Sequence, residues 1–431
     1  MGSVCLTGVG KHPAVKMTLP QPTVLGLRRS FGFGDRLGLA TPGHLAALAG
    51  SGFAGIFAQQ SIREMTRTQR TAPEVMRAAQ TALAEAGYAD EWGADADHLK
   101  TPDDVDVTTA AGFTFFTIDP SDFVNNAADT MAEDGLRREA SAQQAEAVFG
   151  GEDPVALYDG KTYALESGEV TFATEPLLRA IAKYGRALGH IEKMARHIAT
   201  ANAGRLYEIE VSVDETETPT TPLEHLFIAL ELRRRGVVIV SLAPRFIGDF
   251  EKGIDYRGDL AAFEVALKQH MAIARAYGPY KLSIHSGSDK FSVYPAIGRV
   301  CGELLHVKTA GTSYLEALRV VAKADAPLFA EIVQYAGGRF AEDKKSYHIS
   351  VTDNDIPGLL GASDLERVFL DEDHGRQVLH VTFGSVLTVG KGASGRLFKD
   401  AVLETLVQNP DLHAEFLARH LGKHLSLLNA G

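Results

Sequence analysis

The stretch YKLSIHSGSDKFSVYP (280–295) contains the pattern that decides the fold. Its first five residues are typical of a β-strand and lead directly into His285, which a turn of small and polar residues (286–290) follows. Parallel strands buried on both faces end in this way in α/β enzymes, because the carboxyl end of the strand presents a polar side chain and the next loop holds the chemistry. We therefore predict that His285 lies at the edge of a parallel sheet, in a functional site.

Similar apolar runs recur on both sides of this stretch, and helical patterns separate them. The predicted strands are 30–33, 53–58, a short one leading into 92–100, 113–118, 207–213, 237–242, 280–284 and 304–307. Eight alternating units between Ser30 and Ala324 predict a closed (β/α)8 barrel of the TIM type, and a doubly wound open sheet is the alternative. Neither a Gly-x-Gly-x-x-Gly fingerprint after a strand nor a phosphate-binding GxxxxGK[ST] loop occurs, so the sequence does not support a nucleotide site.

Three segments lie outside this pattern. Residues 1–29 are interrupted by prolines and are interpreted as a loosely structured lead-in. Residues 125–172, acidic and rich in alanine, are predicted to form an inserted lid or helical excursion. Residues 325–431 are predicted to form an α-rich cap over the barrel mouth, with one candidate strand at 378–382.

The bulk composition excludes several classes of protein. Of 431 residues, 45% are hydrophobic and 23% charged, with a formal net charge of −12, which argues against nucleic acid or an anionic membrane surface as the partner. The two cysteines, Cys5 and Cys301, are far apart, so we expect no disulfide framework and a reducing cytoplasm. We see neither a signal peptide nor an apolar run long enough to cross a membrane. The sequence leaves open whether the chain forms a homo-oligomer.

Residues 207–213 alternate between polar and apolar side chains. If the apolar set packs on the surrounding helices, then Glu208, Glu210 and Ser212 point into the barrel, and Asp214 follows at its upper rim. An unpaired carboxylate inside a barrel is costly, so it needs a cation, a metal or a shifted pKa. We favour a functional role for Glu210, and a salt bridge to a barrel lysine or arginine is the alternative, chiefly for the deeper Glu208.

The same alternation places Lys281, Ser283 and His285 on the inward face of their strand, and His306 and Lys308 on that of the next strand. Histidines at the ends of adjacent strands are a common way for a barrel to assemble a divalent metal site. We therefore interpret His285 and His306 as metal ligands.

His98, in the sequence DADHLK, is the best candidate for a third ligand. The spacing of the three histidines matches no metal signature, and the alternative is that each caps a helix or packs in the core. His348 and His380, in the predicted cap, are rival ligands. The remaining histidines follow helical patterns typical of surface or packing positions, for example His190, His197, His270, His413, His420 and His424.

Asp97 lies next to His98 and is suited to act as a base beside a metal that holds the substrate. The alternative is a carboxylate that caps a helix or orients a ligand. Positive side chains are expected near the same mouth, which suggests an anionic or polyhydroxylated substrate; they are Lys100, Lys290, Lys308 and Arg245.

Five blocks of the sequence resemble the tagaturonate epimerase family of bacterial hexuronate catabolism. They are GADADHLKT (93–101), YEIEVSVDETETPTTPLEH (207–225), APRFIGDFEKGIDY (243–256), YKLSIHSGSDKFSVYP (280–295) and LHVKTAGTSYLEALR (305–319). The resemblance implies a metal-dependent 4-epimerase of D-tagaturonate and D-fructuronate, or of the ketohexoses D-tagatose and D-fructose. One divalent ion is implied, and Zn, Mn and Ni are all candidates.

The resemblance also implies roles for single residues. It assigns proton acceptance to Asp97 and proton donation to Glu210, although Asp214 and Glu215 lie in the same motif and Asp214 remains an alternative to Glu210. It makes 286–290 a substrate loop, in which Lys290 is the candidate for binding a carboxylate. Substrate contacts are also expected from Lys308, Asp214 and Arg245.

The chemistry of C4 epimerisation restricts the mechanism. In a 2-ketose, C3 is adjacent to the carbonyl carbon but C4 is not, so simple proton abstraction cannot invert C4. The two remaining routes are transient oxidation at C4, which needs a nicotinamide, and retro-aldol cleavage of C3–C4 with rotation and re-addition. Because no nucleotide fingerprint is present, we favour the retro-aldol route. The rival functions are a metal-dependent aldolase of keto sugar acids and a non-catalytic sugar-acid-binding protein.

Overall fold

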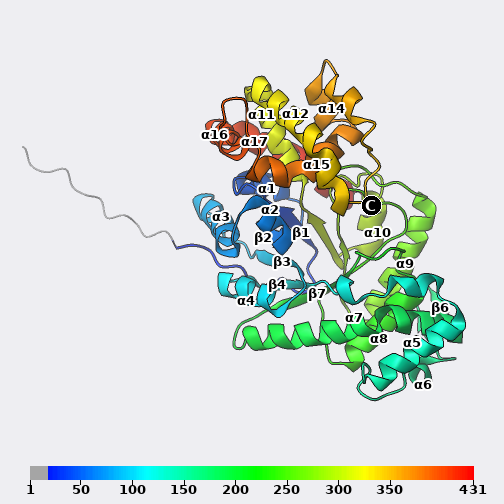
Figure 1. Cartoon of the computed structure of the whole chain (residues 1–431). Helices are drawn as coiled ribbons and strands as arrows, with labels where there is room; N and C mark the ends of the chain where they lie inside the picture. Colours follow the sequence, from blue (N-terminus) through cyan, green and yellow to red (C-terminus); the bar gives the residue numbers. More distant parts are fainter. Residues whose placement is uncertain (1–17) are drawn as a thin grey trace, which may run out of the picture.

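Eight parallel strands form a closed barrel in the computed structural model, which describes residues 18–431. Their order around the barrel is β1-β10-β9-β8-β7-β4-β3-β2, and Figure 1 shows the barrel at the centre of the molecule. The strands are β1 (Ser30–Gly34), β2 (Ala54–Ser61), β3 (Gly93–Leu99), β4 (Phe115–Ile118), β7 (Glu208–Val213), β8 (Ser241–Pro244), β9 (Lys281–Ile284) and β10 (Leu305–Thr309). The predicted (β/α)8 barrel is therefore confirmed. Cys5 and the first 17 residues of the predicted lead-in lie outside the described residues.

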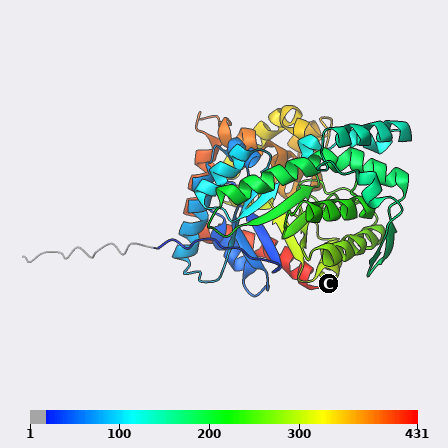
Figure 2. The same cartoon turned by 90° about the horizontal axis from the view of Figure 1, so that it is seen from below.

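Helices follow the strands and surround them, as the view from below shows (Figure 2). They are α1 (Thr41–Leu48), α2 (Ile62–Thr68), α3 (Ala72–Glu85), α4 (Pro102–Ala111), α7 (Thr174–Ala201), α8 (Pro222–Arg234), α9 (Leu260–Tyr277), α10 (Tyr294–Cys301) and α11 (Thr312–Ala324). Helices α3, α4 and α8 each begin with a capping box, in which a threonine and an acidic residue three positions later bond each other's backbone amides. These caps fix the residue at which each of the three helices begins.

The predicted alternation in β7 is present. Ile209, Val211 and Val213 are buried in the apolar core between the strands and the outer helices. Glu210, on the other face, lies 2.8 Å from Nζ of Lys308 across the barrel interior. The lumen is therefore filled by charged and polar side chains, whose partners come from other strands.

Residues between β4 and α7 form an excursion on the outside of the barrel. They comprise η1 (Ser121–Phe123), η2 (Asn126–Thr130), α5 (Glu133–Ala145), α6 (Pro154–Tyr158) and the hairpin β5 (Thr162–Leu165)–β6 (Gly168–Thr171). The excursion packs on α7, α8 and α9 (Figure 1), and Tyr158 donates a hydrogen bond of 2.6 Å to Glu231 of α8. The segment predicted as a lid at 125–172 thus covers the helical layer of the barrel.

The C-terminal part is helical and has its own apolar core, to which α11 also contributes. Its elements are α12 (Ala326–Asp343), η3 (Lys344–Ser346), α13 (Ile356–Leu360), α14 (Leu365–Leu370), α15 (Asp373–Thr388), α16 (Phe398–Gln408) and α17 (Pro410–Asn429). Helix α17 returns to the barrel and packs on α1, α10 and α11.

Two strand predictions are corrected. The run 378–382 lies inside helix α15, where Val378 and Leu379 are fully buried; a helix buried on all sides gives a continuous apolar run that periodicity cannot distinguish from a strand. The strand predicted at 237–242 begins only at Ser241, which pairs with Glu210, and Val238 is 82% exposed.

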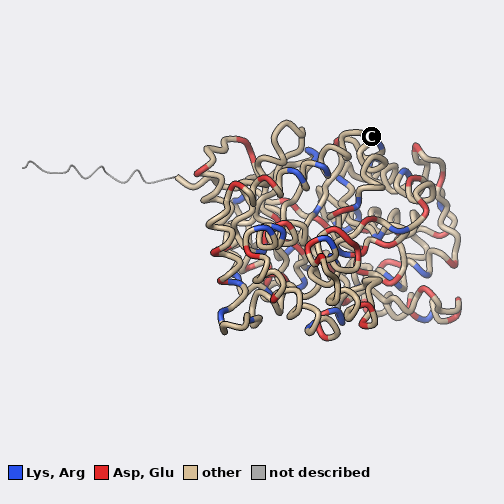
Figure 3. Tube along the Cα trace, turned by 90° about the horizontal axis from the view of Figure 1, so that it is seen from above, with Lys and Arg blue, Asp and Glu red and all other residues tan. Residues whose placement is uncertain are grey.

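Acidic and basic residues are interspersed along the described trace (Figure 3). Within the described residues, no helix combines the length and the apolar character that a membrane crossing requires.

Candidate active site

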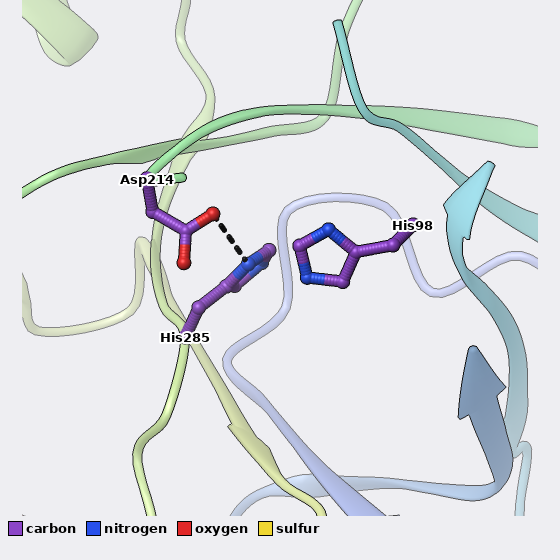
Figure 4. A group of neighbouring side chains, drawn as sticks. All are labelled: His98, Asp214 and His285. Atoms are coloured by element: carbon purple, nitrogen blue, oxygen red, sulfur yellow. Dashed lines mark ion pairs between the residues drawn. The ribbon is translucent and has the colours of Figure 1, made fainter. Parts of the chain in front are cut away.

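His98, Asp214 and His285 meet at the carboxyl ends of the barrel strands (Figure 4). Each offers one ligand atom, and the three atoms lie within 4.8 Å of one another. The centroids of the two imidazole rings are 5.1 Å apart, and Nδ1 of His285 lies 3.4 Å from Oδ1 of Asp214. The three residues come from β3, from the loop after β7 and from the loop after β9, so only the closed barrel brings them together.

The backbone is strained where two of these strands end. His98 has a φ of +50°, and the β3–β4 register shifts between Ala96 and Leu99. In a regular strand Asp97 and His98 would face opposite sides of the sheet, but this irregularity lets both line one cavity. Ser286, directly after His285, also has a φ of +50°. Left-handed backbone at residues other than glycine is costly and gathers at functional sites.

A buried charge cluster lies beneath the cavity, with Lys308 at its centre. Nζ of Lys308 is 2.7 Å from Asp95, 2.8 Å from Asp97 and 2.8 Å from Glu210, and it donates a hydrogen bond of 2.6 Å to Thr117. One ammonium thus holds three carboxylates in place inside the barrel. Because three buried carboxylates share this one ammonium, loss of Lys308 would leave all of them without a cation.

The cluster shifts the pKa of each member. Burial opposes the charge of Lys308, yet its three carboxylates hold the pKa of the ammonium well above its ordinary value. Burial likewise opposes ionisation of Asp97 and Glu210, but the pKa of both is lowered, chiefly by His98 and Lys308 for Asp97 and by Lys308 and His285 for Glu210. For Asp95 burial prevails over Lys308 and raises the pKa to about 7.

Both cavity histidines have raised pKa values. Burial lowers the pKa of His98, but Asp97 and a hydrogen bond to Asp119 outweigh it and raise the pKa to about 10. Asp214 does the same for His285, whose pKa rises to about 9 against the effect of burial. Surplus negative charge thus surrounds the two rings, and it favours a cation at this place.

The two rings also have the hydrogen bonds that metal-binding imidazoles use. His285 donates through Nε2 to Glu210 at 2.8 Å, which leaves Nδ1 facing Asp214. His98 bonds Asp119 through Nδ1 at 3.3 Å, which leaves Nε2 facing the cavity, 3.7 Å from Asp97. A carboxylate on the distal nitrogen fixes the tautomer and orientation of a ligating histidine. The donor set of two imidazoles and one carboxylate fits a divalent transition metal such as zinc, manganese or nickel.

Two adjoining cavities open at this mouth. The inner one is lined by Asp97, His98, Asp214, His285 and Lys308, and an outer one shares Asp214 and His285 with it. Segments from the C-terminal part complete the walls, and they contribute Tyr347 and His380. None of the described residues in the 125–172 excursion lines either cavity.

Helix α15 closes tightly on the loop after β10. A Cβ at Gly311 would lie 1.9 Å from Cε1 of His380, so only glycine permits the imidazole to rest there. His380 is buried, and burial holds its pKa well below the ordinary value. As a neutral ring packed against the backbone, it forms part of the cavity roof.

The structure does not bring His306 into the metal-binding group. It precedes Lys308 by two residues and so lies one inward layer deeper, where Nδ1 is 3.0 Å from the Ser30 hydroxyl and the ring packs on Phe115. Burial lowers its pKa to about 3, so the ring is neutral. Parity alone predicted its inward direction correctly but could not give its depth.

Lys290 is also separated from the cavities. Its ammonium is fully buried and donates to the carbonyl oxygens of Glu251 (2.8 Å), Ile254 (2.5 Å) and Ser288 (2.9 Å). Burial lowers its pKa to about 7. This geometry fastens the loop after β8 to the loop after β9 and leaves no donor for a substrate carboxylate.

The other predicted positive residues differ in position. Arg245 lines the outer cavity and donates to the carbonyl oxygen of Thr216. Lys100 lies outside both cavities and pairs with Asp122 at 2.7 Å. His348, the other rival ligand, lines the outer cavity with a side chain that is 80% exposed.

Sequence reasoning missed Asp95, Asp119, Lys252 and Arg36. Asp95 shares its strand parity with Asp97, and Asp119 directly follows a predicted strand, so the rules applied to other residues would have found both. Lys252 lies in the block 243–256, far from a strand end, and Arg36 lies in a loop. Only the folded chain shows that these two side chains line the cavity.

Comparisons with known proteins agree on one family. The family model described as UxaE, tagaturonate epimerase, matches residues 7–428. A tagaturonate/fructuronate epimerase of Thermotoga maritima is 46% identical over 409 residues, covering 95% of this chain and 82% of that protein.

Solved structures give the same result. A glycerol-bound crystal structure of the fructuronate-tagaturonate epimerase UxaE from Cohnella laeviribosi is 40% identical, with a TM-score of 0.88, over 95% of this chain and 83% of that one. The native crystal structure of the same protein gives the same values. The chain therefore belongs to the tagaturonate epimerase family and is an enzyme of the isomerase class, a carbohydrate epimerase.

Proposed function

We propose that this enzyme is a divalent-metal-dependent 4-epimerase that interconverts D-tagaturonate and D-fructuronate. The observation that supports this most is the group His98, Asp214 and His285 at the barrel mouth, with Asp97 beside it in the cavity wall. The names of the relatives give the substrate pair.

We propose retro-aldol chemistry for the inversion. The C4 hydroxyl loses its proton, the C3–C4 bond breaks, and its electron pair passes to C3 and on to the C2 oxygen while C4 becomes an aldehyde carbon. Rotation of the aldehyde presents its other face, the bond re-forms, and the new C4 oxygen takes up a proton. His98, Asp214 and His285 would hold the divalent ion, which would supply a Lewis acid to stabilise negative charge on the substrate.

Asp97 is the proposed proton acceptor. It lines the cavity, and Lys308 at 2.8 Å keeps its carboxylate ionised and fixed. A general base must lie within hydrogen-bonding distance of the proton that it removes, and Asp97 is placed to approach a sugar hydroxyl beside the metal-binding group.

Glu210, the donor that the resemblance assigns, lies below the cavity and is fully buried. We propose that it acts as a positioning residue, because its Oε1 atom holds both His285 and Lys308. Glu215, in the same motif, lines both cavities and is the proposed group that returns the proton.

Retro-aldol chemistry requires that the two fragments stay enclosed between the steps. Tyr347 and His380 of the C-terminal part line the inner cavity and are suited to retain the aldehyde fragment.

Tagaturonate that carries deuterium at C4 tests the route. The proposal predicts fructuronate with deuterium retained at C4, no primary kinetic isotope effect and no released three-carbon products. A primary isotope effect would show oxidation at C4, and accumulation of fragments would identify an aldolase.

A further inference from the structure

The positive side chains around the two cavities differ in whether a carboxylate neutralises them. Lys308 has three carboxylate partners, Arg36 pairs with Glu64 at 2.9 Å, and Arg63 pairs with Glu215 at 3.3 Å. Nζ of Lys252 donates to the hydroxyl of Ser286, and no carboxylate oxygen of residues 18–431 lies within 4.0 Å of it. Lys252 therefore brings a charge to the cavities without a matched anion.

Lys252 occupies the place where the two cavities meet. It lines both, together with Ser286 and His285. Because Ser286 directly follows His285, the ammonium group is held next to the metal-binding group. Burial lowers the pKa of Lys252, although Asp214 opposes the effect. A half-buried ammonium without a counter-ion is costly, and an arriving anion would remove that cost.

Arg36 also lines the inner cavity, but neighbouring side chains hold its guanidinium. Its guanidinium lies 3.5 Å from the centre of the Phe383 ring and bonds Glu64 through Nε and Nη2. The Nη1 atom is buried and has no hydrogen-bond partner among the described residues. The side chain is only 4% exposed, so packing fixes its direction.

The inner cavity thus carries charged groups of both signs. His98, Asp214 and Asp97 form one part of its wall, and Lys252 and Arg36 bring positive charge to the same space. A hexuronate has two parts that suit these groups. Its reacting carbons C2 to C4 carry oxygens that suit the metal-binding group, and its C6 carboxylate suits the positive side chains. A neutral ketohexose has a hydroxymethyl group in place of that carboxylate.

We propose that Lys252, together with Ser286, binds the C6 carboxylate of the substrate and selects hexuronates over ketohexoses. The inference rests on the proposed function for the identity of the substrate. Charge-assisted hydrogen bonds to a carboxylate are strong and are lost when the carboxylate becomes a hydroxymethyl group.

The experiment compares tagaturonate with tagatose, which differ at C6 in just this way. KM and kcat are measured for both sugars with the wild-type enzyme, Lys252→Met, Lys252→Arg and Ser286→Ala. Lys268→Met is the control, since Lys268 pairs with Glu264 on the outer surface of α9. Calorimetric titration of each protein with each sugar measures binding directly when Asp97→Asn is added to prevent turnover, and circular dichroism verifies folding.

Lys252→Met is expected to lower the ratio of kcat/KM for tagaturonate to that for tagatose by roughly 10- to 100-fold, mainly through KM, because one charged hydrogen bond is lost. Lys252→Arg should restore part of this ratio, Ser286→Ala should lower it less, and the control should leave it unchanged.

An unchanged ratio in folded Lys252→Met would overturn the inference, and so would an equal loss for both sugars. If the wild-type enzyme turned over neither sugar, the proposed function would fail. Calorimetry would then decide the inference by itself, since wild type must bind tagaturonate more tightly than tagatose and Lys252→Met must not.

Discussion

The Nε2 atom of His285 lies 2.8 Å from Oε1 of Glu210, and both side chains are buried. This contact orients the ring so that its other nitrogen faces Asp214. It connects the charged interior of the barrel to the cavity above, because the same carboxylate oxygen also contacts Lys308.

Replacement of Glu210 by glutamine should weaken metal binding. The variant retains the shape of the side chain but loses the charge that orients His285, and such partners of a ligating histidine typically contribute about 10- to 100-fold in affinity. Competition with a chromophoric chelator measures the change. Glu208→Gln, two residues earlier on the same inward face, is the matched control and should bind metal like the wild type.

Alanine variants of the three histidines predicted as metal ligands should fall into two groups according to their metal content. His98→Ala and His285→Ala remove members of the metal-binding group and should abolish metal retention, as measured by elemental analysis of the purified proteins. His306→Ala removes a neutral ring that packs on Phe115 and should leave the metal content intact while lowering stability. Loss of metal from His306→Ala, or normal content in the other two, would contradict this assignment.

Lys308→Met should destabilise the barrel severely. It leaves Asp95, Asp97 and Glu210 buried without their common cation, and breaking a buried ion pair costs about 3–5 kcal/mol. The melting temperature measures the loss. Adding Asp95→Asn should recover part of it, since one fewer carboxylate then needs a partner; no recovery would show that the carboxylates are not the cause.

Asp289 connects the loop after β9 to the C-terminal part, and it predicts a pH dependence. Its carboxylate lies 2.9 Å from Arg376 of α15 and 2.5 Å from His420 of α17. Burial opposes ionisation, but Arg376 first, and His420 after it, hold the pKa of Asp289 well below its ordinary value. A lowered pKa in the folded state gives stability that is present above the unfolded value of about 3.9 and is lost as the pH falls towards the folded value.

Asp289→Asn should therefore lower the melting temperature above about pH 5, and the difference should shrink below about pH 4. Asparagine tolerates the φ of +63° at this position, so the backbone is not a second cause. A difference that persists unchanged in acid would show that the charge of Asp289 does not stabilise the fold.

The sequence predicted those features that local pattern determines. Strand–helix alternation predicted the barrel, and the parity of β7, β9 and β10 predicted that Glu210, Lys281 and Lys308 point inward. Parity gives only the direction of a side chain, so it could not separate His306, deep in the barrel, from His285 at the mouth.

The remaining differences come from long-range packing. Lys290 lies in a polar turn, but the loop 251–254 folds over it and accepts two of its three hydrogen bonds, and the carbonyl oxygen of Ser288 accepts the third. Lys252 lies in that same loop and lines the cavities instead. Helix α15 was mistaken in part for a strand because contacts with α12 and α14 bury it on several sides.

The central claim is metal-dependent inversion at C4 of a hexuronate, and ¹H NMR of tagaturonate incubated with metal-stripped and reconstituted protein tests it most directly. We predict that the stripped protein leaves tagaturonate unchanged and that zinc, manganese or nickel restores its conversion to fructuronate alone. Equal conversion by the stripped protein would contradict the role of the metal, and no conversion with any of the three metals would contradict the assigned reaction.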